Sequence, residues 1–187
     1  MIVVNFKTYQ QGKNALKLAK LIESVDKNAI VCVQAIDINE ISKKTKLKVY
    51  AQHVDSFEEG KNTGYVIPDA IKKDGAKGTL LNHSEHKISF NDLKKAIKLC
   101  NKNKLKVIVC SSNLNEVKKI IKLKPGAIAF EDEKLISTGK SITQYNPEEI
   151  IKFVKLIKNT KIIPLCGAGI SSREDIKTAF DLGCKGV

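Results

Sequence analysis

The stretch Gly78-Thr79-Leu80-Leu81-Asn82-His83-Ser84-Glu85 shows the pattern that most clearly indicates the fold class, a short apolar run followed directly by polar side chains. Ile2-Val3-Val4 leads into Asn5-Phe6-Lys7 in the same way, and Ala127-Ile128-Ala129-Phe130 ends in Glu131. Polar groups at the carboxyl ends of parallel strands are where α/β proteins build their active sites. Lysine, histidine and glutamate are suited to proton transfer next to a carbonyl group, so the sequence predicts such a site there.

Strand-like runs of this kind recur along the chain. They are short and continuously apolar, as expected of parallel strands that are buried on both faces. We expect strands at Ile2–Asn5, Ile30–Gln34, Lys48–His53, Gly78–Asn82, Lys106–Cys110, Ala127–Glu131 and Ile162–Cys166.

Amphipathic helical patterns lie between the expected strands. Three apolar faces are formed by Leu16, Ala19, Leu21, Ile22 and Val25, by Leu93, Ala96, Ile97 and Cys100, and by Ile150, Ile151, Val154 and Ile157. Asn146-Pro147-Glu148 indicates a helix start with proline in the first turn. Ser172-Arg173-Glu174-Asp175 indicates the start of the last helix, and Gly183 its end.

Strict alternation of strands and helices predicts an α/β protein with a parallel sheet. Seven such units, with an eighth strand beginning at Lys185-Gly186-Val187, favour a closed (β/α)8 barrel over an open sheet. This barrel is expected to be C-terminally incomplete in this chain, because an intact one usually runs to ~250 residues. No Gly-x-Gly-x-x-Gly follows the first strand, which argues against a dinucleotide-binding fold.

The composition is that of a single folded domain. The chain has 187 residues, of which 42% are apolar, so we expect one domain spanning residues 1–187. It contains no run of about 18 apolar residues, so no transmembrane helix is expected. Its first residues lack the basic region and cleavage site of a secretory signal, and we expect a cytoplasmic protein.

The five cysteines are Cys32, Cys100, Cys110, Cys166 and Cys184, and none of them has Cys-x-x-Cys spacing. Three lie in strand-like runs, so we interpret the cysteines as small buried apolar residues in a reducing compartment. A metal site would need clustered ligands, and the sequence shows no such cluster, so no metal is expected.

The formal net charge is +13, which leaves a nucleic-acid-binding module open as one class of function. Arg173 is the only arginine, and the lysines are spread over helix faces instead of forming one block. No zinc finger, RNP-like aromatic pattern or basic arm is visible. Solvated lysine faces explain the charge, and we expect no nucleic-acid or membrane partner.

Taken in order, the motifs resemble triosephosphate isomerase, in particular its archaeal form. Asn5-Phe6-Lys7 and Asn82-His83-Ser84-Glu85 are similar to the family's segments after the first and fourth strands. Tyr50-Ala51-Gln52-His53 resembles the family's third strand, and Asn62-Thr63-Gly64 resembles its subunit-crossing loop. Glu131 is similar to the catalytic base, and Leu135-Ile136-Ser137-Thr138-Gly139 to the lid that follows it. Cys166-Gly167-Ala168-Gly169-Ile170 resembles the phosphate loop. The resemblance runs from Ile2 to Val187 and implies a TIM barrel.

The chain also departs from the family pattern. Asp132 and Glu133 follow Glu131, where the family has proline, which stiffens a hinge. Ser137 replaces the first glycine of the lid, and His86-Lys87 stands where the family has an arginine-containing segment. These departures motivate an alternative, a catalytically weak or inactive isomerase-like protein that binds phosphate.

The resemblance implies an aldose–ketose isomerase of glycolysis and gluconeogenesis that interconverts dihydroxyacetone phosphate and glyceraldehyde 3-phosphate. Glu131 would move the proton, His83 would polarise the carbonyl as a neutral electrophile, and Lys7 would supply fixed positive charge. These roles follow the triosephosphate isomerase mechanism, a known example of pKa tuning. Substrate binding is implied for Asn5, Phe6, Lys7, Ile136, Ser137, Gly167, Ala168 and Gly169. His53 and His86 are interpreted as structural or surface residues.

The reaction implied by the resemblance needs neither a metal nor another cofactor. The expected partners are therefore the triose-phosphate substrate and further copies of the chain, in a homodimer or homotetramer.

Overall fold

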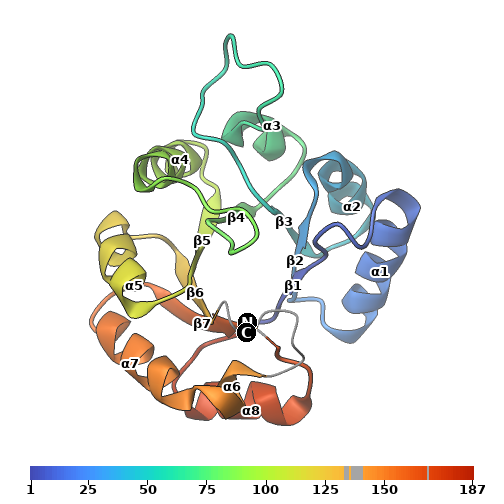
Figure 1. The fold of residues 1–187 in the computed structure, drawn as a ribbon. Coiled ribbons are helices and arrows are strands. Elements are labelled where there is room, and N and C mark those ends of the chain that lie inside the picture. Colours follow the sequence, from blue (N-terminus) through green and yellow to red (C-terminus); the bar gives the residue numbers. More distant parts are fainter. Residues whose placement is uncertain (133–134, 136–140, 168) are drawn as a thin grey trace. The chain divides into compact units, whose positions relative to one another are not determined.

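The structure is a computed structural model, which describes residues 1–132, 135, 141–167 and 169–187 (Figure 1). The chain divides into two compact units. The first unit comprises Met1–Leu81 and Ile88–Val107, and the second comprises Asn82–Lys87 and Ile108–Val187. Strands and helices alternate in both units. The expectation of one domain over residues 1–187 stays a prediction.

The first unit contains four parallel strands in chain order. They are β1 (Val3–Asn5), β2 (Ile30–Val33), β3 (Lys48–Ala51) and β4 (Gly78–Leu81). β2 and β4 are buried throughout, as the continuous apolar runs predicted. Burial on both faces is what a helix-covered parallel sheet requires.

The helices of the first unit are α1 (Gly12–Val25), α2 (Ile38–Lys44), α3 (Pro68–Lys73) and α4 (Phe90–Lys102), with a short 3-10 turn, η1 (Ala35–Asp37). The apolar face predicted for α4 is confirmed, because all four of its residues are buried. Ser89 caps this helix by accepting a hydrogen bond from the Asp92 amide.

α1 buries a narrower stripe than its apolar spacing predicted. Ala15 and Ala19 are fully buried, whereas Leu21 and Val25 are 62% and 82% exposed. With 3.6 residues in each turn, Leu21 is rotated by about 200° from Ala19 and so faces the other way. Val25 is the last residue of the helix. The predicted face is therefore wrong for these two residues.

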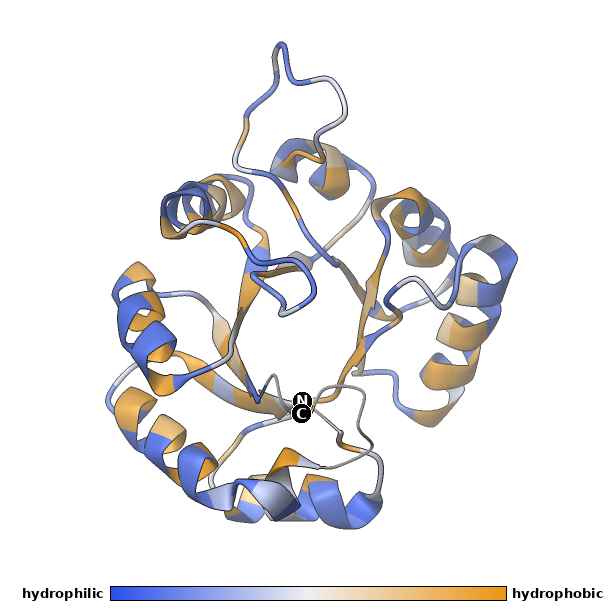
Figure 2. Ribbon diagram, in the orientation of Figure 1, coloured by the Kyte–Doolittle hydropathy of each residue, from blue (hydrophilic) through white to orange (hydrophobic). Residues whose placement is uncertain are grey.

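The second unit is built around three parallel strands, β5 (Lys106–Ser111), β6 (Ala127–Glu131) and β7 (Ile163–Gly167), of which β5 begins in the first unit. Its helical elements are α5 (Leu114–Ile120), η2 (Ile121–Leu123), α6 (Ile142–Tyr145), α7 (Pro147–Ile157) and α8 (Arg173–Asp181). Figure 2 shows the strands as mainly apolar, whereas α5 and α7 carry both apolar and polar residues. Together the two units contain all seven expected strands, with ends within two residues of prediction.

Two helix starts in the second unit agree with the sequence signals. α7 begins at Pro147, and Ser172 caps α8 in a capping box with Asp175. On α7, Ile150 and Ile157 are buried as predicted, but Ile151 is exposed and Phe153 takes its place in the buried stripe. Phe153 stacks on Phe130 of β6, with ring centroids 5.2 Å apart.

The segment after α8 lies beside β7. The Lys185 amide donates to the Pro164 carbonyl over 2.8 Å, and the Cys166 amide donates to the Gly186 carbonyl over 3.3 Å. Residues 185–187, where the sequence predicted the beginning of an eighth strand, make these two bonds but form no strand in the structure.

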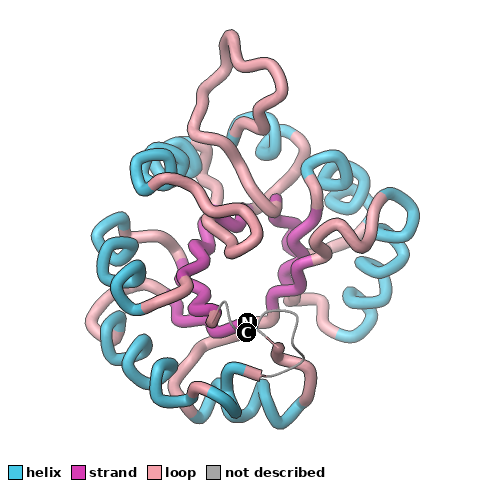
Figure 3. The backbone as a smooth tube through the Cα atoms, viewed as in Figure 1, coloured by secondary structure: helices cyan, strands magenta, loops and turns pink. Residues whose placement is uncertain are grey.

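A long loop, residues 52–67, connects β3 to α3 in the first unit (Figure 3). Phe57 and Tyr65 pack against each other within it, with ring centroids 4.4 Å apart. The Asp55 carboxylate accepts a hydrogen bond from the Val66 amide and ties the two arms of the loop together. Among the described residues, no helix is long and apolar enough to cross a membrane.

Candidate active site

His83 and Glu131 face each other in the second unit. Nε2 of His83 lies 3.8 Å from Oε2 of Glu131, and the two side chains are only 13% and 16% exposed. Glu131 is the last residue of β6, and His83 belongs to the turn formed by residues 82–87. A hydrogen bond of 2.8 Å from the His86 amide to the His83 carbonyl closes this turn. The structure thus brings together two of the three predicted catalytic residues.

The backbone around His83 selects one form of its ring. The Glu85 amide donates a hydrogen bond to Nδ1 over 3.2 Å, so Nδ1 is the acceptor. In the neutral imidazole the proton is then on Nε2, the nitrogen that faces Glu131. The Glu85 carboxylate lies 3.7 Å from Nδ1, beyond hydrogen-bonding distance, and its side chain is half exposed. A neutral ring with a proton on Nε2 is a hydrogen-bond donor for a carbonyl oxygen.

Gly167 lies next to the Glu131 carboxylate. The two residues are paired in the register of β6 and β7. A Cβ atom on residue 167 would lie 3.4 Å from both Cγ and Oε1 of Glu131. Gly169, two residues further on, has φ +69°, a left-handed conformation that glycine adopts readily. The predicted phosphate loop therefore begins beside the predicted base.

The segment after Glu131 is only partly described. The Asp132 carboxylate accepts a hydrogen bond of 3.2 Å from Nδ2 of the Asn146 side chain. The backbone amide of Leu135 donates to the backbone carbonyl of Asp132 over 2.9 Å. Three of the predicted substrate contacts, Ile136, Ser137 and Ala168, lie outside the described residues, as does Glu133.

The predicted residues Asn5, Phe6 and Lys7 form a tight turn in the first unit, at the end of β1. Lys7 has φ +48°, and its amide donates to Oδ1 of Asn5 over 2.9 Å. Its carbonyl accepts a hydrogen bond of 2.8 Å from Nε2 of Gln52. Phe6 is buried, and its amide donates to the Cys32 carbonyl over 2.9 Å. Both polar residues of the motif are thereby fixed in their backbone positions.

Two carboxylates that the sequence analysis missed organise the second unit around the site. Glu116 on α5 binds groups of the His83 turn. Asp175 on α8 is almost fully buried and accepts hydrogen bonds from the amides of Ser171 and Ser172, just after the predicted phosphate loop. No local sequence pattern could have indicated Glu116, because its partner Asn82 is 34 residues away. For Asp175 the capping-box spacing after Ser172 was the available signal.

The other two histidines have different surroundings. Nε2 of His53 lies 3.3 Å from Oδ1 of Asp55 in the first unit. His86 contributes its amide to the closure of the His83 turn. Among the described residues, no group of three or more histidine, cysteine, aspartate or glutamate side chains is placed to hold a metal ion.

Residues 1–187 match the protein family described as triosephosphate isomerase. The chain belongs to the triosephosphate isomerase family. Archaeal triosephosphate isomerases are similar to it over its whole length. Those of Methanocaldococcus jannaschii and Methanothermus fervidus are 40% identical, and the match spans 89% and 88% of their lengths. That of Sulfolobus acidocaldarius is 39% identical over 84% of its length.

The fold is also that of solved triosephosphate isomerases. The enzyme of Bartonella henselae, known from a crystal structure, matches 99% of this chain with a TM-score of 0.76 and 15% identity, and the match covers 89% of that chain. The chain therefore has the α/β fold of a TIM barrel, with seven strands among the described residues where a complete barrel has eight. The expectation that the chain is an isomerase is likewise confirmed.

Proposed function

We propose that Glu131 and His83 are the proton-transfer pair of a triose-phosphate isomerase in this chain. The observation that carries the proposal is the 3.8 Å approach of Nε2 of His83 to Oε2 of Glu131. A carbonyl compound bound against both groups would meet a base at its C–H bond and a hydrogen-bond donor at its carbonyl oxygen. Such a pair can move a proton between the two carbons of a hydroxy ketone.

The reaction then proceeds in two balanced steps. The Glu131 carboxylate removes a proton from C1 of dihydroxyacetone phosphate, and the electron pair of that C–H bond forms the enediolate. The proton on Nε2 of His83 makes a hydrogen bond to the oxygen on which negative charge develops. The proton of the C1 hydroxyl then passes to the C2 oxygen, and Glu131 returns its proton to C2, so that C1 becomes the aldehyde carbonyl and C2 carries the hydroxyl of glyceraldehyde 3-phosphate.

The remaining predicted residues are proposed as substrate contacts. Lys7 would supply positive charge to the phosphate and the oxyanion. Asn5, which accepts a hydrogen bond from the Lys7 amide, and Phe6 are proposed to contact the substrate beside it. The segment 167–169 would present amide groups to the phosphate, because glycine-rich turns form such anion sites. The lid residues Ile136 and Ser137 are proposed for the same role on the strength of their place in the family motif.

The test is a steady-state isomerase assay of the intact chain in both directions. Glu131→Gln and His83→Gln should each lower kcat by at least ~100-fold, the usual effect of a general acid–base group. Glu149→Gln is the matched control, because Glu149 pairs with Lys152 on α7 and lies outside the site. Near-normal turnover in Glu131→Gln would remove this residue from the mechanism. An inactive parent chain that still binds triose phosphate would favour the weak or inactive alternative.

We also propose that the chain assembles into a homodimer or a homotetramer and acts in the cytoplasm, where glycolysis and gluconeogenesis require it. Loop 52–67, with Asn62-Thr63-Gly64 near its tip and the packed pair of Phe57 and Tyr65, supports the first proposal. Exposed aromatic side chains are common in subunit interfaces. Light scattering at micromolar concentration should give the mass of two or four chains, and a stable monomer would contradict the proposal.

A further inference from the structure

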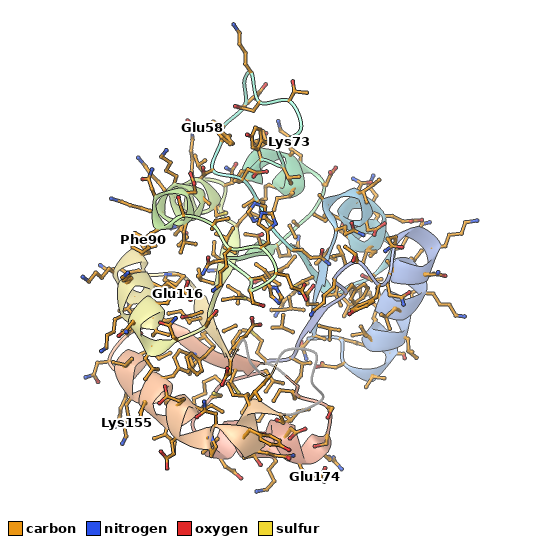
Figure 4. All side chains as sticks on the ribbon, viewed as in Figure 1. Glu58, Lys73, Phe90, Glu116, Lys155 and Glu174 are labelled. Atoms are coloured by element: carbon orange, nitrogen blue, oxygen red, sulfur yellow. The ribbon has the colours of Figure 1, made fainter. Side chains whose placement is uncertain are left out.

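Glu116 holds both ends of the turn that carries His83. Oε1 of Glu116 accepts a hydrogen bond of 2.8 Å from Nδ2 of Asn82, which begins the turn. Oε2 lies 3.1 Å from Nζ of Lys87, which ends it. The Ser112 amide also donates to Oε2 over 2.8 Å. One carboxylate therefore links the first and last residues of the turn to the segment after β5 (Glu116 is labelled in Figure 4).

The position of Asn82 makes this link important. Asn82 is buried and has φ +60°, in the left-handed region that costs an ordinary residue free energy. Its Nδ2 atom donates to the Cys110 carbonyl over 3.0 Å as well as to Glu116. Since Asn82 immediately precedes His83, its backbone direction sets where the imidazole ring begins.

Glu116 is itself well fixed. Its amide donates to Oδ1 of Asn113, which caps α5. Burial opposes the charged form of its carboxyl group, but the hydrogen bonds from Ser112 and Asn82 and the charge of Lys87 outweigh it, so the pKa of Glu116 lies below its ordinary value. Glu116 is therefore ionised at neutral pH, and charge-assisted hydrogen bonds of this kind are the stronger ones.

We propose that Glu116 is a positioning residue for His83, acting through Asn82 and Lys87 and not through contact with the substrate. The inference rests on the proposed function of His83 and assigns a structural source for the placement of its ring. A displacement of about 1 Å can cost ~100-fold in rate when a catalytic group must meet a reacting atom. Loss of Glu116 should therefore lower turnover more than substrate binding.

The first test is Glu116→Ala in the intact chain. We expect kcat to fall by about 10- to 100-fold while KM changes by less than about threefold, since the proposed phosphate contacts do not involve Glu116. The imidazole nitrogen signals of His83, recorded by NMR on histidine-labelled protein, should shift or broaden. His53→Gln and His86→Gln identify the His83 signals among the three histidines.

Glu116→Gln provides a variant that conserves shape. Its side-chain oxygen can still accept the hydrogen bond from Asn82, but the glutamine lacks the charge for Lys87 and the second acceptor for Ser112. We expect partial rescue, with kcat and the His83 signals between those of the parent chain and Glu116→Ala. This variant also tests the proposal if Glu116→Ala fails to fold.

Glu149→Ala is the matched control, because it removes a partly buried glutamate that is paired with a lysine outside the His83 turn. The Glu149 side chain is 30% exposed and pairs with Lys152, much as Glu116 is 27% exposed and pairs with Lys87. Glu149→Ala should leave both kcat and the His83 signals unchanged.

The two readouts separate this proposal from the proposed function. If the parent chain is inactive, the proposed function fails, but the NMR signals still show whether Glu116 places the ring. If Glu116→Ala and Glu116→Gln both leave the His83 signals unchanged, the positioning role is overturned whatever the activity. An unchanged kcat in an active enzyme would overturn it equally.

Discussion

Gly167 stands opposite Glu131 in the pairing of β6 and β7, and no other residue type could stand there without touching the carboxylate. A Cβ atom at this position would lie 3.4 Å from Oε1 of Glu131, an ordinary van der Waals contact. Alanine would therefore fill the remaining space, and a longer side chain would push the carboxylate aside. Position 167 therefore has room for a small residue only.

The first prediction uses this contact. Gly167→Leu should lower kcat/KM by at least ~100-fold by displacing the Glu131 carboxylate, whereas Gly167→Ala should have a much smaller effect. Steady-state kinetics measures both, with thermal unfolding as the check that the variants fold. If the leucine variant keeps more than about half of the parent activity, the carboxylate does not need the position it has beside Gly167.

The second prediction concerns Asp175. This buried carboxylate accepts hydrogen bonds from the Ser171 amide, from the amide and hydroxyl of Ser172, and from Gln144, 2.9 to 3.1 Å in length. Burial opposes ionisation, but these bonds outweigh it, and the pKa of Asp175 lies well below its ordinary value of 3.8. Asp175→Asn should lower the free energy of unfolding at pH 7 by about 1–3 kcal/mol.

The pH dependence of Asp175→Asn follows from the sign of this shift. Because the pKa of Asp175 is lowered in the folded state, its carboxylate stabilises the fold at pH values above its ordinary pKa of 3.8. This contribution is lost progressively as the pH falls from that value through the lowered pKa. The difference between Asp175→Asn and the parent chain should therefore narrow below about pH 4. Urea unfolding across this range measures it. Asp181→Asn, which removes an exposed acid of the same helix, should show little difference at any pH.

The third prediction concerns thiol chemistry. All five cysteines are buried and reduced, as the sequence analysis expected of small apolar residues. Burial raises the pKa of Cys100 to about 12, and the hydrogen bond with Cys184 together with burial raises that of Cys166. Because the thiolate is the reactive form, the native chain should react only slowly with Ellman's reagent at pH 8. In denaturant all five thiols should react rapidly. If one thiol per chain reacts rapidly in the native protein, that cysteine is not buried as described.

The strands were predictable from the sequence because burial on both faces leaves an unbroken apolar run, and their ends were marked by the polar residues that follow. Glu131 could be placed at the end of its strand for the same reason, whereas Gly167, expected in the loop after Cys166, is the last residue of β7. The apolar face of α1 was less predictable, because Leu21 and Val25 are apolar but exposed. Apolar surface is common on folded proteins, so an apolar residue on a helix does not prove burial.

The network around His83 could not be predicted, because it joins residues that are distant in the sequence. Nothing in Asn113-Leu114-Asn115-Glu116 indicates that the glutamate reaches the turn after β4. Likewise, the backbone hydrogen bond from Glu85 to Nδ1 of His83 depends on the local conformation of the turn. Such contacts need a three-dimensional arrangement, since the residue types alone occur in many solvated loops.

The left-handed conformation of Lys7 has a consequence for any attempt to make this enzyme more robust. A selection that rewards heat resistance alone should favour Lys7→Gly, because glycine removes the backbone strain of about 1 kcal/mol at φ +48° while the hydrogen bond from the residue 7 amide to Oδ1 of Asn5 remains. The same gain is open at Lys124, which has φ +51° at the end of η2. Lys124→Gly should keep full turnover. Lys7→Gly should give a protein of higher thermal stability that has almost no turnover. Robustness and activity thus compete at Lys7, and only a screen that also scores turnover would retain the lysine.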